Sequence, residues 1–321
     1  MTTEQLKRIS VIDPLSPAFE RVKIILFKPF DLGKWFVIGF CAWLAYLGTG
    51  GGGGGNGGGR GRGYNRAHWS IDDVRYQVGE AKEFFLANMF WVIPVVIIVI
   101  LVILCLWVLF TWLSSRGRFM FLHCVAENKA EVKIPWTKFR EHAGSLFLFR
   151  IVVGLVAFAI FGLPFLIVAF SLVAMSAGPT FVPAVLGIIA AVLVFILLGI
   201  IFWLIHRFTM DFVVPIMFLR TISCTTAWRE FLDLLSVNKA RFVLYALFRI
   251  VIAIVIGFII FLSFCIGLCC CCVSVLLLIP YIGTVILLPV YVFERSYSLY
   301  YIRQYGSQFD VFNLAAEVAP Q

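Results

Sequence analysis

The stretch that decides the fold runs from Asp211 to Val251 and reads DFVVPIMFLRTISCTTAWREFLDLLSVNKARFVLYALFRIV. It combines a Met-Phe-Leu-Arg run, an amphipathic segment and the start of a long apolar run. Parts of it occur earlier in the chain: Met-Phe-Leu-His stands at 120–123, and Leu-Phe-Arg-Ile-Val stands at both 148–152 and 247–251. Such matches at nearly equal offsets predict an internal duplication.

The composition predicts an integral membrane protein. Of 321 residues, 62% are hydrophobic and 13% are charged, whereas about a quarter of the residues of a soluble domain are charged. The 33 Phe and 9 Trp residues often flank long apolar runs, as aromatic residues do at membrane interfaces. Long unbroken runs exclude a transmembrane β-barrel, whose strands alternate over short stretches. The predicted fold class is therefore all-α.

The net charge of +9 comes from 26 Lys+Arg against 17 Asp+Glu. Topology explains this excess without a nucleic-acid partner, because basic residues concentrate in cytoplasmic loops. The sequence has no zinc-finger or RNA-recognition spacing, so we expect no nucleic-acid binding. The polar N-terminus and the late first apolar run predict no cleavable signal peptide.

Six apolar runs predict six transmembrane helices, at 35–47, 90–113, 147–173, 181–205, 242–267 and 273–293. The first is short for a hydrocarbon core of about 30 Å, so it either borrows flanking residues or is re-entrant. A glycine-rich segment at 50–63 follows it and is typical of a flexible linker. A polar connection is expected at 114–135, and Glu294 to Gln304 is expected to form a last interfacial segment before the polar tail.

The six helices fit one plan used three times. Each repeat begins with an amphipathic segment whose first aromatic residue is Phe19, Trp136 or Trp228, and continues as a transmembrane hairpin. Amphipathic segments with a charged face are suited to the membrane interface. The whole chain is expected to form one membrane domain, with repeat units at about 17–124, 136–221 and 227–304.

The distribution of basic residues predicts the orientation. With both termini in the cytoplasm, the inner segments hold nineteen Lys and Arg and the outer loops five. This is the asymmetry that the positive-inside rule requires. The three amphipathic segments then all lie at the cytoplasmic face, where membrane lipids and a protein partner are the expected contacts.

Arg150 and Arg249 are the only basic residues that lie inside the predicted spans. Both stand near the start of a span, so they are expected to extend to the lipid headgroups as anchors, or to bind lipid phosphate. Asp211 and Glu230 are interpreted as solubilising acids or as partners of Arg207 and Arg229. The spans offer no carboxylate near the membrane midplane, which disfavours an ion-coupled transporter.

Cysteines gather near the end of the fifth span, at 265 and 269–272. Cys265, Cys269 and Cys272 share one helix face and are weak candidates for a soft metal or a redox site. The competing interpretation is that they are small apolar residues in a tight turn. The four histidines lie far apart and are interpreted as solvated or interfacial. No catalytic motif occurs, so the prediction is a protein that is not an enzyme and holds no cofactor.

Three stretches carry a resemblance to known proteins: DPLSPAFERVKIILFKPFDLGKWFVIGF (13–40), FVVPIMFLRTISCTTAWREFL (212–232) and LLPVYVFERSYSLYYIRQYGSQFDVF (287–312). They resemble a family of uncharacterised bacterial multi-pass membrane proteins. More distantly, they are similar to the membrane domain attached to some glycerophosphodiester phosphodiesterases, whose catalytic barrel and metal ligands this sequence lacks. The resemblance implies a bacterial inner-membrane setting and no activity.

These observations leave three functional hypotheses. The first is a non-enzymatic inner-membrane scaffold or accessory subunit that uses its interfacial helices at the cytoplasmic leaflet or against a partner. The second is a pore or lipid-handling protein, with an apolar groove opened by Gly154, Gly162, Gly187 and Gly199. The third is the cysteine-dependent redox or metal site. The sequence does not determine the ligand, the biological process or the oligomeric state.

Overall fold

The computed structural model of the chain describes residues 9–48, 88–177, 181–269 and 279–312. Helices and short connections make up this part of the chain, and no strand occurs within those ranges. The prediction of an all-α protein is therefore confirmed. The glycine-rich segment at 50–63 lies outside the described residues.

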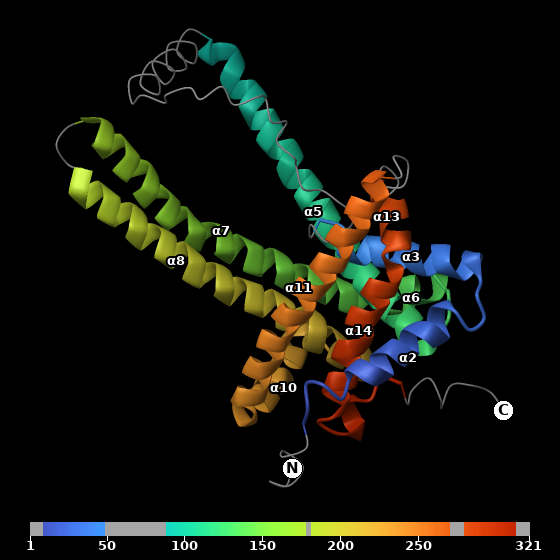
Figure 1. Cartoon of the computed structure of the whole chain (residues 1–321). Coiled ribbons are helices and arrows are strands. Elements are labelled where there is room, and N and C mark those ends of the chain that lie inside the picture. The colour runs from blue at the N-terminus through green and yellow to red at the C-terminus, as the bar shows by residue number, and fades with distance from the viewer. Residues whose placement is uncertain (1–8, 49–87, 178–180, 270–278, 313–321) are drawn as a thin grey trace. The chain divides into compact units, whose positions relative to one another are not determined.

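Thirteen helical segments follow one another in the described ranges (Figure 1). They are α2 (Leu15–Leu26), α3 (Leu32–Tyr46), α5 (Met89–Glu127), α6 (Lys133–Lys138), α7 (Arg140–Ala177), α8 (Phe181–Phe208), the π-helix η1 (Thr209–Val213), α9 (Val214–Arg220), α10 (Cys224–Val237), α11 (Lys239–Cys269), α13 (Pro280–Ile286), α14 (Leu288–Arg303) and the 3-10 turn η2 (Ser307–Phe309).

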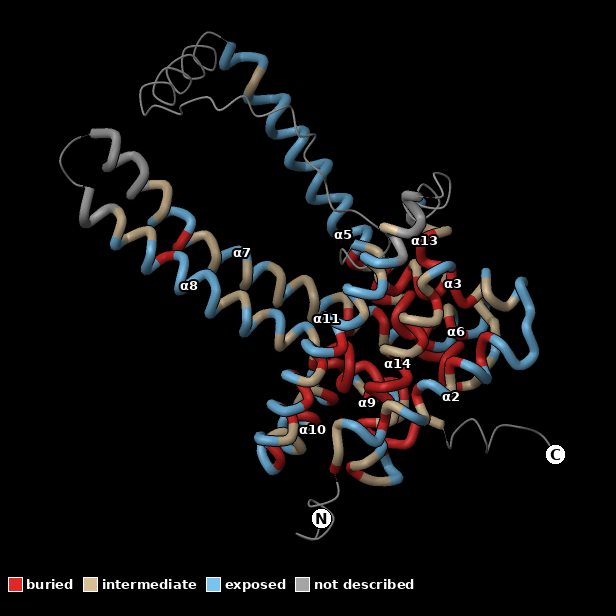
Figure 2. Tube along the Cα trace, viewed as in Figure 1, coloured by how far each residue is buried: buried red, intermediate tan, exposed pale blue. Residues whose placement is uncertain are grey.

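Four helical stretches are long and apolar enough to cross a membrane: Met89–Glu127, Arg140–Ala169, Val185–Arg220 and Lys239–Leu262. Their most apolar windows are almost entirely exposed (Figure 2), with at most 22% of the residues buried. Such surfaces are stable in lipid and not in water. These four candidate spans fit a membrane protein.

The two remaining predicted spans are shorter. The helix α3 has 15 residues, about 22 Å at about 1.5 Å per residue, which is less than a hydrocarbon core of about 30 Å. The last predicted span, at 273–293, begins outside the described residues and is then divided at Leu287 between α13 and α14. Six spans and three repeated hairpins therefore stay predictions.

The chain forms two compact units, each built from separate stretches of sequence. Unit 1 comprises Met1–Gly55, Phe110–Arg150 and Leu204–Gln321, and unit 2 comprises Asn56–Leu109 and Ile151–Trp203. In unit 2, α7 and α8 run side by side (Figure 1). The Phe161 ring lies 4.9 Å from that of Phe195 and 5.6 Å from that of Phe202.

Unit 1 contains most of the buried residues (Figure 2). Aromatic rings hold its helices together: Phe212 of η1 stacks on Phe231 of α10 at 5.3 Å, and Phe242 of α11 stacks on Tyr305 at 5.2 Å. Tyr245 lies 4.4 Å from Tyr301. Pairs of this kind add to the burial of their apolar area, so α10, α11 and α14 pack around η1.

The predicted polar connection at 114–135 is wrong for its first half, because α5 continues to Glu127. Its small residues face the interior and let another helix approach. Ser114 donates a hydrogen bond of 2.8 Å to the carbonyl of Ala45. A Cβ atom at Gly117 would lie 2.8 Å from the carbonyl oxygen of Leu44. The polar residues of this stretch therefore form the contact with α3.

The predicted interfacial segment after residue 293 is also wrong as a separate element. It is the continuation of α14, and most of its residues are buried, including Tyr297, Leu299 and Ile302. The tyrosine rings and aliphatic side chains pack into unit 1, which the sequence pattern of mixed polar and aromatic residues did not indicate.

Helices form at all three predicted amphipathic segments, as α2, as α6 with the start of α7, and as α10. Several of their apolar residues, among them Ile25, Phe139 and Phe231, are buried in unit 1, whereas Phe19 is 60% exposed. The helix α2 packs against α14. These apolar faces therefore contribute to the core of the protein, and contact with the membrane interface stays a prediction.

Candidate functional site

Asp211 is buried at the centre of a group of charged side chains in unit 1. It lies in η1, and π-helical turns inside helices are frequent at functional sites. Its Oδ2 atom lies 2.9 Å from Nε of Arg207, four residues earlier, and accepts a 2.9 Å hydrogen bond from the hydroxyl of Tyr245. Nε of Arg249 is 3.7 Å from the same oxygen. One carboxylate oxygen therefore faces three donors from two helices.

Glu294 of α14 completes the ion pairs. Its Oε1 lies 3.2 Å from Nη2 of Arg249 and 3.8 Å from Nη2 of Arg207. Both arginines thus bridge the two carboxylates. The Arg249 side chain is 3% exposed, whereas Arg207 and Glu294 keep 24% and 16% of their side-chain surface exposed.

Two further buried arginines lie in the same group. Arg295 donates from Nη1 to the carbonyl oxygen of Met210 at 2.6 Å. The guanidinium of Arg118 stands over the ring of Tyr46, 4.4 Å from its centre, a cation–π contact. Arg118 and Arg295 are 8% and 6% exposed. No ion pair within 4 Å joins either of them to a carboxylate among the described residues.

We call this group of six the arginine centre: Arg118, Arg207, Asp211, Arg249, Glu294 and Arg295. Four arginines against two carboxylates give it an excess of two positive charges at neutral pH. Burial lowers the pKa of Arg295 to about 10, and the nearby Tyr46 and Asp211 oppose this shift. Arg295 therefore remains protonated at pH 7 and contributes to the excess.

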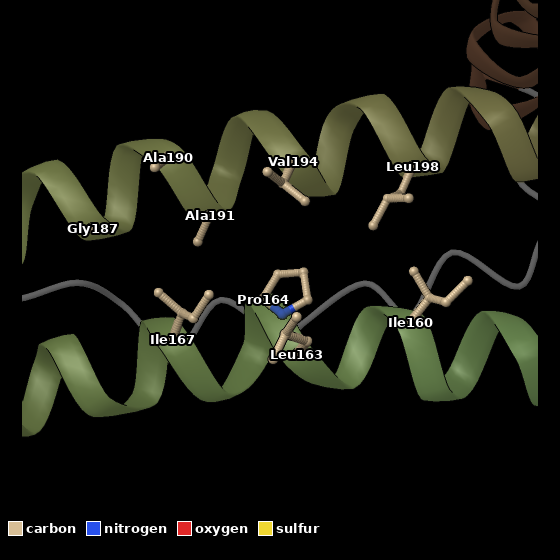
Figure 3. A pocket seen from close by; sticks show the side chains of 9 residues that line it. All are labelled: Ile160, Leu163, Pro164, Ile167, Gly187, Ala190, Ala191, Val194 and Leu198. Atoms are coloured by element: carbon tan, nitrogen blue, oxygen red, sulfur yellow. The ribbon is translucent and has the colours of Figure 1, made fainter.

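A second feature lies in unit 2, where an apolar groove of about 390 Å³ opens between α7 and α8 (Figure 3). Its lining residues are Ile160, Leu163, Pro164, Ile167, Gly187, Ala190, Ala191, Val194 and Leu198. Small side chains on α8 face Pro164 and the larger aliphatic side chains on α7. Nothing charged lines the groove, so it suits a hydrocarbon chain.

The sequence model of one protein family matches residues 9–282. The chain belongs to the family of unknown function DUF7544. This match agrees with the expectation of an uncharacterised family and assigns no activity to DUF7544. The similarity to the phosphodiesterase membrane domain stays a prediction. No curated protein matches the chain, and no solved structure matches it either.

In this DUF7544 protein the two arginines singled out from the sequence lie in different surroundings. Arg249 is a buried member of the arginine centre, so its side chain contacts carboxylates of the protein. Arg150 is half-buried and donates from Nη1 to Ser114 Oγ at 3.2 Å and to Ser115 Oγ at 3.1 Å. Lipid-phosphate contacts at both residues stay a prediction.

The expected acid–base partners are confirmed in one case. Asp211 pairs with Arg207, although it is buried and does not solubilise the helix. Glu230 pairs with Arg220 at 2.6 Å and not with Arg229, because residues ten positions apart meet when α10 packs against α9. His123 is also buried, with Nδ1 lying 3.0 Å from Oε1 of Glu127, so it is not solvated, and its place at the membrane interface stays a prediction.

The structure leaves the cysteine hypothesis untested. Cys265 is half-buried in α11, Cys269 is the last residue of that helix, and Cys272 lies outside the described residues. Across the described ranges, no group of three His, Cys, Asp or Glu side chains could hold a metal ion.

The sequence analysis missed Glu294, Arg295 and Arg118 as members of a site. One signal was present: Glu294 and Arg295 directly follow a long apolar run. Charged residues next to such a run can be buried with it, and buried charges need partners of opposite charge. The i, i+4 spacing of Arg207 and Asp211 was a second signal, because residues at this spacing meet on one helix face.

Proposed function

We propose that this DUF7544 protein is a non-enzymatic inner-membrane scaffold or accessory subunit. The observation that carries the proposal is where its ionisable residues lie. Residues 89–109 and 151–203, which include the apolar parts of three candidate spans in unit 2, contain no Asp, Glu, Lys, Arg or His. Transporters coupled to ions or protons place such residues near the midplane, so a solute pathway through unit 2 is disfavoured.

The charged residues of the spans instead pair inside unit 1, whose helices form a packed core. A unit with a packed core can present an outer surface on which a partner docks with little backbone change. We place both chain termini and the three amphipathic segments on the cytoplasmic side, since most basic residues belong to the segments that would lie there.

Crosslinking in the membrane, followed by affinity purification and native mass spectrometry, tests this proposal. A protein partner bound in stoichiometric amount supports it. Purified protein that moves a solute across a vesicle membrane, or that converts a lipid by itself, contradicts it.

The six-span arrangement is part of the proposal and has its own test. With six spans the glycine-rich segment at 50–63 lies on the side opposite to the termini, whereas with the four long helices alone it lies on the same side. An epitope inserted at residue 56 and probed in intact and permeabilised cells distinguishes the two. Labelling that requires the same permeabilisation as the N-terminus rejects the first span.

Lipid handling is the second candidate function, and the groove between α7 and α8 favours it. A 390 Å³ space lined by apolar side chains can receive part of an acyl chain. Among the four glycines of the earlier hypothesis, Gly187 lines the groove. Gly154 packs against Trp107, and a Cβ atom at Gly162 or Gly199 would meet open space.

Filling the groove tests this function. Gly187→Leu is expected to reduce lipid retained after delipidation, as measured by native mass spectrometry. Gly199→Leu, which adds the same side chain outside the groove lining, is the matched control. Equal lipid retention in both variants rejects the groove as a lipid site.

A further inference from the structure

The arginine centre carries more positive charge than its carboxylates neutralise. Asp211 and Glu294 compensate two of its four arginines, and all three arginines apart from Arg207 are more than nine-tenths buried. Uncompensated buried charge is strongly unfavourable, because each ion loses its hydration without gaining a partner. A stable protein is expected to hold a compensating negative group here.

Three arginines also keep donor nitrogens without a hydrogen-bond acceptor. In the part of the chain that the structure describes, Nε of Arg118, Nη1 of Arg249 and Nη2 of Arg295 are buried and have no such partner. Buried polar atoms are nearly always paired. The three donors come from α5, α11 and α14, so an anion that accepts from more than one of them would link these helices.

These arginines interact as one group. The charge of Arg118 is within electrostatic range of Arg207, Asp211 and Glu294. The charge of Arg295 is within range of Asp211 and Arg118. The side chains of Arg207 and Glu294 are 24% and 16% exposed, so these two members of the centre reach the surface of unit 1.

We propose that the arginine centre is an anion site that binds a phosphate group, supplied either by a phospholipid headgroup or by free phosphate. The guanidinium fork presents paired N–H donors that match the oxygens of phosphate. A tetrahedral oxyanion can accept from several donors at once, as three guanidinium groups from different helices require. The proposal is independent of the scaffold function.

Arg118→Gln is the informative variant, because Arg118 is not ion-paired to Asp211 or Glu294 and its removal leaves their pairs with Arg207 and Arg249 in place. Arg118→Lys keeps the positive charge but removes the paired N–H donors of the guanidinium group. This variant replaces Arg118→Gln in the experiment if the glutamine variant does not fold. Arg229→Gln, at an exposed position on α10, removes one positive charge elsewhere and is the control.

The experiment measures thermal unfolding of the full chain in detergent across a series of inorganic phosphate concentrations at constant ionic strength. A ligand that binds only the folded state stabilises it by RT ln(1 + L/Kd), where L is the ligand concentration, so the Tm rises with that concentration. We expect phosphate to stabilise the wild type and Arg229→Gln alike. Arg118→Gln should need about ten-fold more phosphate for the same shift, since one charge-assisted contact is lost.

Native mass spectrometry of the same preparations identifies the source. A phospholipid retained one-to-one by the wild type and lost from Arg118→Gln assigns the site to a headgroup. Stabilisation by phosphate with no retained phospholipid assigns it to the free anion. The proposal is overturned if phosphate stabilises wild type and Arg118→Gln equally, or if neither phosphate nor phospholipid binds.

Discussion

Asp211→Asn is the substitution for which the structure makes the clearest prediction. Asparagine has nearly the same shape as aspartate and retains an oxygen that can accept from the hydroxyl of Tyr245. The substitution therefore removes the negative charge and little else. Arg207 and Arg249 are left with Glu294 as their only carboxylate within 4 Å in the described chain.

The expected loss follows from the burial of the group. The side chain of Asp211 is 7% exposed and that of Arg249 is 3% exposed, so water cannot replace the missing partner. Removing one member of a buried ion pair costs about 3–5 kcal/mol, because the other charge stays buried without compensation. We expect the free energy of unfolding to fall by an amount in this range.

Glu230→Gln is the matched control, because it also neutralises an acid that pairs with an arginine. The Arg220 and Glu230 side chains are 40% and 22% exposed, and ion pairs of this kind contribute about 0–1 kcal/mol. Denaturant-induced unfolding of both variants in the same detergent, followed by tryptophan fluorescence, gives the two losses. The structure predicts that the loss for Asp211→Asn is several-fold larger.

A double-mutant cycle extends the test to the pairing itself. If Asp211 compensates Arg249, Arg249→Gln in the Asp211→Asn background should cost less than it does alone, because neighbouring charges couple by about 0.5–3 kcal/mol. Two results refute the reasoning: a loss for Asp211→Asn below that of Glu230→Gln, or strictly additive effects in the cycle.

Three further predictions concern unit 1. Gly117→Ala should destabilise the protein or prevent its folding, because the new methyl group meets the backbone of α3. Gly144→Ala is the control: a Cβ atom there has open space, so this substitution should keep or raise the Tm. Tyr245→Phe removes the hydroxyl donated to Asp211 and should lower stability by about 1–3 kcal/mol, measured by unfolding. Burial raises the pKa of the Cys224 thiol to about 12, so this thiol should react with an alkylating reagent at pH 8 only after the protein unfolds. Mass spectrometry that finds Cys224 alkylated in the folded protein contradicts this prediction.

Apolar periodicity and run length sufficed to predict the helical class and the four long spans. These two signals suffice for lipid-facing helices, because such a helix needs only a continuous apolar surface that is long enough to cross the hydrocarbon core. The short helix at Leu32–Tyr46 shows where this signal ends. Its buried residues, including Cys41 and Ala42, pack against protein, and length alone does not reveal whether an apolar stretch faces lipid or a core.

The arginine centre was not predictable as a site, for a physical reason. Its members come from α5, α8, η1, α11 and α14, so the contacts depend on tertiary packing that one sequence does not contain. Only the Arg207–Asp211 pair was expected, as one of two interpretations of Asp211, and its i, i+4 spacing makes it local to one helical stretch. Arg249 was recognised as unusual inside an apolar run, but Glu294, its partner, lies forty-five residues away.

The position of these charges along the chain explains how such apolar helices assemble into one arrangement. A core made only of Leu, Ile, Val and Phe can repack in several ways with little loss, and many of the spans' residues are of these types. The arginine centre removes that freedom, because Asp211 on η1 meets Arg249 on α11, and Glu294 on α14 meets both Arg207 and Arg249, in one register only. A slip of one helical turn, about 5.4 Å, would separate Arg249 from both carboxylates and Glu294 from Arg207, and would keep only the local Arg207–Asp211 pair. The ion pairs are therefore expected to select one packing of the helices of unit 1. Two arginines would suffice for pairing with Asp211 and Glu294, so the choice of packing does not explain why the centre holds four.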